Sequence, residues 1–478
     1  MSGRVVPSDD EEGTTTSFEI TTPEDVLQAL GKWNPFLIYI TISMALIWGL
    51  TAMPIMVSAF IIDGVKCSTN DTSCMDEKER MVDVKDEENF FSPEWVSSSF
   101  FVGNMIGGTL LSYMADRIGR RLIVMPSLFF LGIFGVLAAF ATNFPLLLLC
   151  RFCQGFFFTS SSMVNWVLAC ESISIRAHAH ASMLFGLCWV VGYCIVAPIA
   201  FLFANWRWIM FCSSVPSVVF ACIFWFTIPE SLLFLIEKRR RTEVEKWVRR
   251  AERPSRPVVL DVDKVLSHRG DDTDARLDDS VDSTSHDQLI PFFANNSIYV
   301  LYLMIACYMW ITDFLVYNGM SLFSTTLVGN PYMNYILSGL VELPAYLITP
   351  ELLNRFGRRN TVIISHLFTG LCLTSLYFVP QEWSFLYITI WLCGKLATSM
   401  SFMCLFVYGS EIFPTAVRNS CMGICSMVSN LGAVLAPHVK HLGLIHPALP
   451  VISFGASSLI SAALALLLPE TIHVHPTY

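Results

Sequence analysis

The stretch Asp116-Arg117-Ile118-Gly119-Arg120-Arg121 recurs as Asn354-Arg355-Phe356-Gly357-Arg358-Arg359, about half the chain further on. Other pairs of residues keep nearly the same offset. They are Glu171 with Glu411, Arg176 with Arg418, and Pro229-Glu230-Ser231 with Pro469-Glu470-Thr471. A repeat of this length, in a chain this apolar, indicates two similar membrane-embedded halves.

Composition supports a membrane protein. Hydrophobic residues make up 54% of the 478 residues and charged residues 14%, whereas soluble domains carry about 25% charged residues. The net charge of −9 comes mainly from acidic residues in the N-terminal segment and two loops. No segment resembles a nucleic-acid-binding face, so we expect no nucleic-acid partner. The polar, acidic N-terminal segment does not have the apolar core of a cleavable signal peptide.

Twelve segments are apolar enough to be membrane spans, since a spanning helix needs about 20 mostly apolar residues. The sequence therefore predicts an all-α membrane protein with two six-helix halves. The first six spans centre on 36–62, 95–115, 122–141, 144–170, 181–203 and 208–228, and the second six on 298–317, 331–350, 361–379, 385–408, 421–439 and 450–468.

Basic residues in the short loops predict the orientation of these spans. Cytosolic loops carry an excess of lysine and arginine. With the N-terminus inside, the outer loops hold little more than Arg207 and Lys440. We therefore expect both termini in the cytosol. The inner loops would hold Arg117, Arg120, Arg121, Arg176, Arg355, Arg358, Arg359 and Arg418.

Domain boundaries follow from the spans. A cytosolic segment covers 1–35, and the first half covers 36–228 with an extracellular loop at 63–94. A cytosolic central loop at 229–291 precedes the second half at 292–468 and a cytosolic tail at 469–478. Cys67 and Cys74 flank the sequon at Asn70, so the extracellular loop holds a candidate disulfide and a candidate glycosylation site.

The loop after the second span carries a recognisable motif. Ser112-x-x-x-Asp116-Arg117-x-Gly119-Arg120-Arg121 resembles the signature loop of the major facilitator superfamily, which implies the fold of that family. The glycine permits a tight turn, and Asp116 can pair with arginines to hold the halves in one conformation. Anchoring by positive charge alone is the alternative. The predicted latch residues are Asp116, Arg117, Arg120, Arg121, Glu171, Arg355, Arg358, Glu411 and Arg418, with Asn354 replacing the acid in the second copy.

Further segments narrow this resemblance. Within that superfamily the chain is similar to the organic ion transporters of solute carrier family 22, over nearly its whole length. A departure is the short first outer loop, where family members usually carry a long, cysteine-rich one. The similar segments are Thr22-Pro23-Glu24-Asp25-Val26-Leu27, Arg151-Phe152-x-Gln154-Gly155, Pro229-Glu230-Ser231-x-x-Phe234-Leu235, Leu340-Val341-Glu342-Leu343-Pro344-Ala345 and Tyr408-Gly409-Ser410-Glu411-Ile412-Phe413-Pro414-Thr415-x-x-Arg418-Asn419.

Ionisable groups inside spans mark candidate sites, because each costs about 2.5–3.5 kcal/mol on insertion scales. The resemblance implies that Tyr317 lines the cavity, that Glu342 lies near the substrate and that Trp166 supplies an aromatic face. An acid beside aromatic rings suits an organic cation. A structural ion pair of an acid with Lys395 or Arg151 is the alternative. The predicted substrate-binding residues are Trp166, Asp313, Tyr317, Glu342, Lys395 and Asn430.

Asn430 departs from the family pattern. The resemblance implies aspartate at this position in cation transporters and arginine in anion and carnitine transporters. Anion transporters also carry a lysine where this chain has Tyr346. The balance favours cations or zwitterions. Asn430 is a candidate hydrogen-bond partner of the substrate or of a neighbouring helix.

Together these features predict an alternating-access carrier of small organic ions in the plasma membrane, with the substrate between the halves. Membrane potential alone could drive a cation, since about 100 mV is worth roughly 2.3 kcal/mol per charge. Carriers of organic anions or of a sugar-like neutral solute are one alternative, and a non-transporting receptor or scaffold is another. The sequence contains no catalytic, cofactor-binding or metal-binding constellation, so we expect neither an enzyme nor a cofactor. It does not indicate an oligomeric state.

Overall fold

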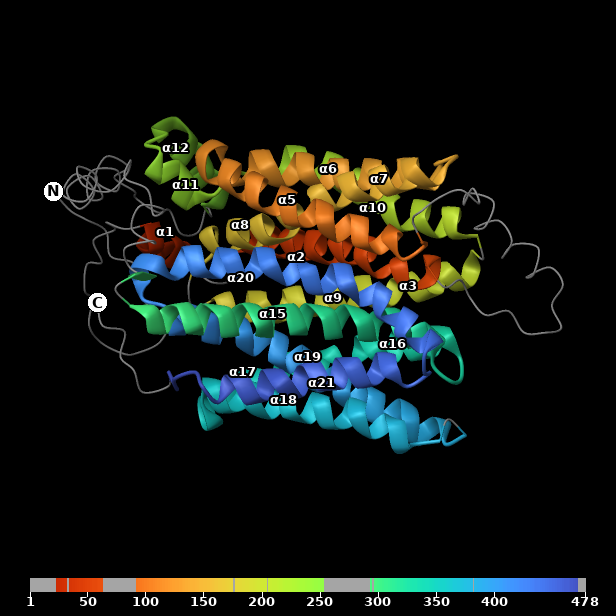
Figure 1. The fold of residues 1–478 in the computed structure, drawn as a ribbon. Helices are drawn as coiled ribbons and strands as arrows, with labels where there is room; N and C mark the ends of the chain where they lie inside the picture. Colours follow the sequence, from red (N-terminus) through yellow and green to blue (C-terminus); the bar gives the residue numbers. More distant parts are fainter. Residues whose placement is uncertain are drawn as a thin grey trace.

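The computed structural model describes residues 23–31, 34–62, 92–174, 177–203, 205–252, 293–294, 296–380 and 382–471. All regular secondary structure in these ranges is helical. The helices run side by side in one elongated bundle (Figure 1). We call the end where α6 begins at Arg120 and α18 at Arg358 the arginine end. The other end, which holds α3, is called the opposite end.

Within the described ranges, the first half contains six helical segments and three short accessory helices. The helix α1 (Pro23–Leu30) precedes the bundle, and α11 (Leu232–Glu237) and α12 (Arg241–Ala251) follow it at the arginine end (Figure 1). The bundle helices are α2 (Pro35–Met56) with α3 (Ser58–Ile61), α5 (Trp95–Ile118), α6 (Arg120–Ala139), α7 (Phe144–Phe156) with η1 (Ser160–Val164) and α8 (Asn165–Glu171), α9 (His178–Leu202), and α10 (Trp206–Thr227).

The second half repeats this pattern in the order of the chain. Its helices are α15 (Ser297–Phe323) with η3 (Ser324–Thr326), α16 (Pro331–Leu340) with α17 (Glu342–Phe356), α18 (Arg358–Ser375) with η4 (Leu376–Phe378), α19 (Ser384–Ile412), α20 (Thr415–Leu435) with η5 (Ala436–Leu444), and α21 (Leu449–Ala465).

Ten helical segments in the described ranges are long and apolar enough to cross a membrane, and each coincides with a predicted span. The predicted spans at 95–115 and 450–468 are also helical, as α5 and α21. However, α21 has 17 residues, and α5 carries polar residues such as Asn104. The all-helical membrane fold is thus confirmed. The total of twelve spans and the cytosolic position of the termini stay predictions.

Local sequence explains where several helices begin. Asn34 caps α2 by accepting a hydrogen bond from the N–H of Phe36, and Asn143 caps α7 by accepting one from the N–H of Leu146. Gly119 has φ +130° between α5 and α6, and Gly357 has φ +86° between α17 and α18. Other residues rarely adopt these conformations, so both copies of the motif need glycine there.

Glycine also permits close packing inside the first half. A Cβ atom on Gly103 would lie 2.0 Å from the carbonyl oxygen of Phe152, and one on Gly107 would lie 1.9 Å from that of Phe156. Both distances are far below van der Waals contact. The spacing of four residues therefore places the smooth face of α5 against α7, as expected for small residues in membrane helices.

Contacts between the halves concentrate near the opposite end. Thr325 Oγ1 donates to the carbonyl oxygen of Ala59 at 3.2 Å, and the Tyr335 hydroxyl donates to that of Met56 at 3.3 Å. The rings of Phe60 and Tyr335 lie 4.7 Å apart. These contacts join α2 and α3 of the first half to α15, η3 and α16 of the second, so the halves are closed against each other at this end.

Candidate functional site

A buried ion pair lies where the halves meet. Lys395 of α19 and Glu342 of α17 are both 0% exposed, and Lys395 Nζ lies 3.5 Å from Glu342 Oε1. The ammonium group also donates to Ser321 Oγ at 2.7 Å and to the carbonyl oxygen of Tyr317 at 3.2 Å. Three helices of the second half thus converge on one positive and one negative charge. We call this group the Glu342 site.

Lys395 balances the charge of the Glu342 carboxylate, but the carboxylate oxygens remain poorly hydrogen-bonded. Among the described residues, neither of its oxygens has a hydrogen bond of good geometry, although the hydroxyls of Tyr317 and Tyr346 lie close enough to influence it. The Lys395 ammonium directs its closest donations to Ser321 and Tyr317. A buried acceptor without a donor costs about 1–3 kcal/mol, and more when it is charged. The carboxylate is therefore well placed to accept hydrogen bonds from a ligand.

Aromatic side chains from both halves surround this ion pair. Lys395 Nζ lies 3.4 Å from the ring centroid of Tyr317 and 5.9 Å from that of Tyr193 of α9. Trp189, also on α9, donates from Nε1 to the Tyr317 hydroxyl at 3.1 Å. Tyr193 in turn stacks on Tyr335 with centroids 4.6 Å apart. The faces of these rings attract cations.

Trp166 is connected to this site through other aromatic rings and not by direct contact. Its ring lies 6.5 Å from that of Trp48 and 4.8 Å from that of Phe185. The ring of Trp48 lies 6.2 Å from that of Trp189, which bonds Tyr317. Trp166 therefore belongs to an aromatic chain in the first half that ends at the Glu342 site.

Asn430 joins the two halves. Its Oδ1 accepts a hydrogen bond of 2.8 Å from Asn104 Nδ2 on α5, and its own Nδ2 donates to the carbonyl oxygen of Ser426 at 3.0 Å. Thr159 donates in turn to Asn104 Oδ1. The structure thus places Asn430 against a helix of the other half, which is the neighbouring-helix alternative.

Asp313 is held elsewhere in the second half. Ser401 donates to its carboxylate at 2.9 Å, and His366 Nδ1 lies 3.7 Å from Asp313 Oδ1. Of the six predicted substrate-binding residues, the structure brings together Tyr317, Glu342 and Lys395. Sequence reasoning missed Tyr193, Trp189 and Ser321, because aromatic and hydroxyl residues in apolar helices give no signal of the direction in which they point.

Arg151 is a structural tie and pairs with no acid among the described residues. It is 1% exposed. Its guanidinium donates to the carbonyl oxygens of Val96 and Pro54 at 3.1 and 2.9 Å, and to Gln154 and Ser58 at 2.6 and 2.8 Å. These bonds connect α2, α3, α5 and α7. The alternative in which Arg151 neutralises Glu342 or Asp313 is therefore not seen among the described residues.

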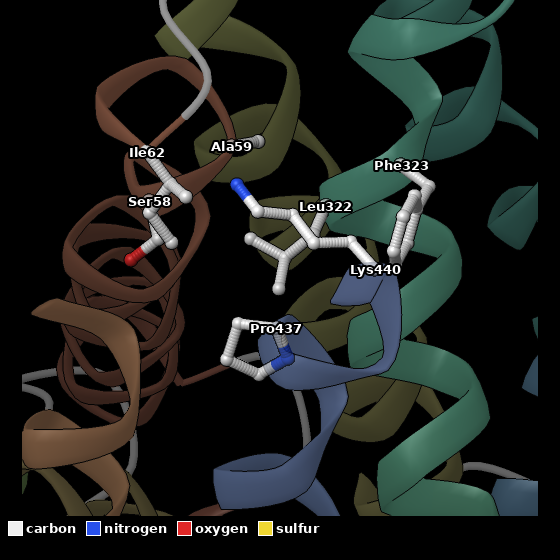
Figure 2. Close-up of a pocket in the computed structure, with 7 residues that line it drawn as sticks. All are labelled: Ser58, Ala59, Ile62, Leu322, Phe323, Pro437 and Lys440. Atoms are coloured by element: carbon white, nitrogen blue, oxygen red, sulfur yellow. The ribbon is translucent and has the colours of Figure 1, made fainter. Parts of the chain in front are cut away.

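Two small pockets lie nearer the opposite end. One separates Ser58, Ala59 and Ile62 from Leu322, Phe323, Pro437 and Lys440 (Figure 2). The second is lined in part by Ser321, the hydrogen-bond partner of Lys395. The first pocket offers no acid, so the Glu342 site remains the better candidate for a cation.

The arginine motif of the first half forms a compact cluster. Arg120 pairs with Asp116 at 3.0 Å and with Glu171 at 3.1 Å. The Glu171 carboxylate also accepts a hydrogen bond of 2.6 Å from Ser231. Glu230 accepts from the N–H groups of Arg121 and Ser231. The motif thus ties the α5–α6 turn to the ends of α8 and α10.

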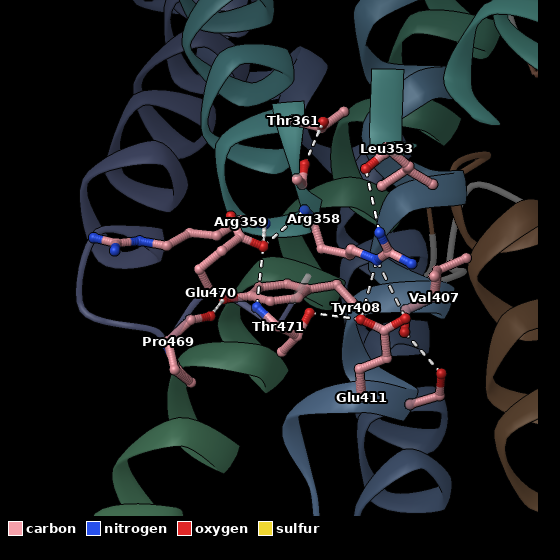
Figure 3. Close-up of polar contacts among 12 residues, drawn as sticks. Leu353, Arg358, Arg359, Thr361, Val407, Tyr408, Glu411, Pro469, Glu470 and Thr471 are labelled. Atoms are coloured by element: carbon pink, nitrogen blue, oxygen red, sulfur yellow. Dashed lines mark hydrogen bonds and ion pairs between the residues drawn. The ribbon is translucent and has the colours of Figure 1, made fainter. Parts of the chain in front are cut away.

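The second half builds the same cluster at the repeated positions (Figure 3). Arg358 pairs with Glu411 at 3.1 Å, and Thr471 donates to the same carboxylate. The Glu470 carboxylate accepts from the N–H groups of Arg358 and Thr471 at 2.9 and 3.0 Å. The internal repeat read from the sequence is therefore also a structural repeat.

The two clusters do not touch each other. In the described parts of the chain, no hydrogen bond or ion pair joins the Arg120 cluster to the Arg358 cluster. The other predicted latch residues contact their own half: Arg117 lies over the Tyr113 ring, Arg121 bonds the carbonyl oxygen of Trp225, Arg355 pairs with Glu351, and Arg418 bonds the carbonyl oxygen of Phe413. Arg176, Cys67, Cys74 and Asn70 lie outside the described residues.

Comparison with known sequences identifies relatives. The sequence profile of the Major Facilitator Superfamily matches residues 85–437. A Caenorhabditis elegans relative whose name assigns it to transporters is 31% identical over 99% of this chain and 95% of its own. The Drosophila melanogaster organic cation transporter protein is 31% identical over 79% of this chain and 68% of its own. Solute carrier family 22 member 1 of Bos taurus is 30% identical over 79% of this chain and 64% of its own.

Solved structures share the fold. The inward-open xylose transporter XylE of Escherichia coli superposes with a TM-score of 0.62 over 91% of this chain and 96% of its own, at 16% identity. A crystal structure of a D-xylose–proton symporter superposes with a TM-score of 0.63 over 92% of this chain and 99% of its own, at 17% identity. The resemblance read from the motifs is therefore confirmed, and this chain belongs to the Major Facilitator Superfamily, with organic cation transporters and solute carrier family 22 members among its relatives.

Proposed function

We propose that the chain carries small organic cations across the plasma membrane and binds them at the Glu342 site. The observation that carries this proposal is the fully buried Glu342 carboxylate, which makes no hydrogen bond of good geometry with the described residues and lies among aromatic rings of both halves. A cation needs an opposite charge and polarisable faces in such an environment. Both are supplied together here.

Lys395 does not exclude a cation from this site. Its ammonium is anchored by Ser321 and Tyr317, and its separation of 3.5 Å from Glu342 leaves the carboxylate oxygens unbonded. A substrate N–H group or a quaternary ammonium can approach those oxygens. Lys395 then lowers the affinity for the substrate cation, because both positive charges interact with the single negative charge of Glu342. Partial compensation suits a carrier, which must also release its cargo.

Relatives and fold support transport by alternating access. Two of the relatives are named as organic cation transporters, and the inward-open XylE structure shares the fold. The halves of this chain meet through hydrogen bonds at the opposite end, whereas the arginine clusters stay within their own halves. We propose that the arginine end faces the cytosol, that it is the end released in this conformation, and that each cluster keeps one half rigid while the halves rock.

An uptake measurement tests the substrate class. Cells expressing the chain would receive labelled tetraethylammonium or labelled para-aminohippurate, with untransfected cells as background. We expect saturable uptake of tetraethylammonium and none of para-aminohippurate. Uptake of para-aminohippurate alone would contradict the proposal and would mean that Lys395 sets the charge of the site. Surface biotinylation of the same cells tests the plasma-membrane location.

A further inference from the structure

A second buried cluster of titratable groups lies in the second half. Asp313 of α15, His366 of α18 and Ser401 of α19 are 2%, 1% and 0% exposed. Ser401 Oγ lies 2.9 Å from Asp313 Oδ2 and 3.0 Å from His366 Nε2. His366 Nδ1 lies 3.7 Å from Asp313 Oδ1. One carboxyl, one hydroxyl and one imidazole from three helices thus form a closed group.

Charge balance requires a proton in this cluster. Glu342 and Lys395 balance each other at the neighbouring site. In the described parts of the chain, Asp313 has no lysine or arginine at ion-pair distance. A lone carboxylate at this depth is costly. The cluster is neutral when it holds one added proton, either on the Asp313 carboxyl or on the His366 imidazole.

We propose that Asp313, Ser401 and His366 form a proton-binding site, and that its proton leaves as an organic cation binds at the Glu342 site. This inference rests on the proposed function. One positive charge arrives and one departs, so the net charge buried in the second half stays constant. The resulting cycle exchanges one proton for one substrate cation.

The Ser401 hydroxyl can transfer the proton between the two partners. With His366 protonated, Nε2–H donates to Ser401 Oγ and the hydroxyl donates to the Asp313 carboxylate. With Asp313 protonated, its O–H donates to Ser401 Oγ and the hydroxyl donates to neutral His366 Nε2. The distances of 2.9 and 3.0 Å permit both chains. No bond other than O–H and N–H bonds is made or broken.

The helices that form the cluster also form the Glu342 site. Asp313 precedes Tyr317 by one turn of α15, and Ser401 follows Lys395 on α19. A cation that moves Tyr317 or Lys395 therefore shifts the same two helices on which Asp313 and Ser401 lie. Coupling needs such a shared element with two arrangements.

Few other charges face the cluster. Cys404, one turn beyond Ser401 on α19, is the remaining titratable group beside Asp313 in the described parts of the chain. Tyr317 on α15 and Lys395 on α19 lie one to two turns away. From α18 the facing titratable group is His366 itself. In these ranges α17, α20 and α21 bring no charged side chain to Asp313 or His366.

The test uses the purified full-length chain in liposomes, with the membrane potential held at zero by potassium and valinomycin. The interior is made one pH unit more acidic than the exterior, and labelled tetraethylammonium is added outside. One-for-one exchange predicts up to about tenfold accumulation per pH unit. It also predicts that tetraethylammonium raises the interior pH, as read with a trapped pH-sensitive dye.

Variants separate coupling from structure. Asp313→Asn and His366→Gln are expected to abolish accumulation driven by the pH difference and the dye signal, while exchange of labelled for unlabelled tetraethylammonium continues. Ser365→Ala is the matched control, because Ser365 is buried next to His366 and bonds the carbonyl oxygen of Thr361. That control should keep both activities.

The outcomes distinguish this inference from the proposed function. If the natural chain exchanges tetraethylammonium but ignores the pH difference, or if the variants lose exchange and accumulation by the same factor, the proton site is overturned. If the natural chain moves no tetraethylammonium, the proposed function fails. Infrared spectroscopy then decides on the proton site, which predicts either a protonated carboxyl band that is missing in Asp313→Asn or an imidazolium band that is missing in His366→Gln. Absence of both bands overturns it.

Discussion

Asn104 of α5 and Asn430 of α20 connect the two halves through a hydrogen bond of 2.8 Å between their side chains. Asn430 stands where the resemblance implies a charged selector, so its neutral amide leaves the charge of the cavity to Glu342 and Lys395. The same bond must break if the halves separate near Asn430. We therefore expect substitutions at this position to change both selectivity and the conformational equilibrium.

Replacing Asn430 by aspartate tests its role in selectivity. Aspartate can still accept the hydrogen bond from Asn104, and it adds a negative charge between the halves. We expect the KM for tetraethylammonium to fall roughly tenfold, the size of one charge-assisted hydrogen bond. Ser429→Ala is the control, because Ser429 is buried next to Asn430 and bonds the carbonyl oxygen of Ser426. An unchanged or higher KM for the aspartate variant would place Asn430 outside the substrate path.

The ion pair between Glu94 and Lys440 predicts how the opposite end responds to pH. Burial raises the pKa of Glu94, and hydrogen bonds from Lys440 and Ser92 lower it. The lowering effects together are larger, so the pKa lies below its usual value of 4.5. The pair therefore contributes fully above pH 4.5 and is lost as the pH falls through the lowered pKa. We expect no change in closure between about pH 5 and 8 from this pair.

Spin labels at Phe140 and Phe385, exposed near the opposite end of each half, can measure this closure by pulsed electron resonance. Glu94→Gln should broaden the distance distribution at neutral pH toward longer distances. Lowering the pH below 4.5 should do the same to the natural chain and should not add to the effect of the substitution. Closure that changes in the natural chain between pH 5 and 8 would contradict the assignment of this response to Glu94.

The arginine clusters predict coupling within halves and none between them. A double-mutant cycle on thermal stability should give an interaction energy of about 0.5–3 kcal/mol for Arg358 with Glu411, since the two are in contact. The same cycle for Arg120 with Glu411 should give about zero. Interaction energies of equal size for the two pairs would show that the clusters meet across the halves and act as the latch predicted from the motif.

Much of the fold was predictable from the sequence because hydrophobic length and the arginine repeat are local signals. The span ends at Phe144 and Pro331 agree with helix starts, as asparagine caps and proline fix them. The site was only partly predictable. Glu342 and Lys395 are visible as charges in apolar segments, but their contact depends on the packing of α17 against α19.

The partners of other charged residues were not predictable for the same reason. Asp313 is also a charge in a span, yet it faces His366 and Ser401 and not the Glu342 site. Arg151 was a candidate partner for an acid, but backbone carbonyls satisfy it. A single sequence shows which residues are costly to bury, whereas the partner of each depends on helix rotation, which the pattern of apolar residues around these helices does not determine.

The central claim is that the Glu342 carboxylate binds the cation. Its most direct test is the KM for tetraethylammonium in Glu342→Gln, at matched surface expression. Glu351→Gln is the control, because Glu351 lies exposed on the same helix and pairs with Arg355. Since Glu342→Gln leaves Lys395 buried without its partner, the double variant Glu342→Gln with Lys395→Met checks folding.

We predict a KM at least about tenfold higher in Glu342→Gln, the loss of one charge-assisted interaction. The control should be unchanged, and the double variant should reach the surface with transport still impaired. The account would be contradicted if the surface-expressed double variant had the same KM and maximal rate as the unmodified chain. The carboxylate would then be a structural partner of Lys395 and nothing more.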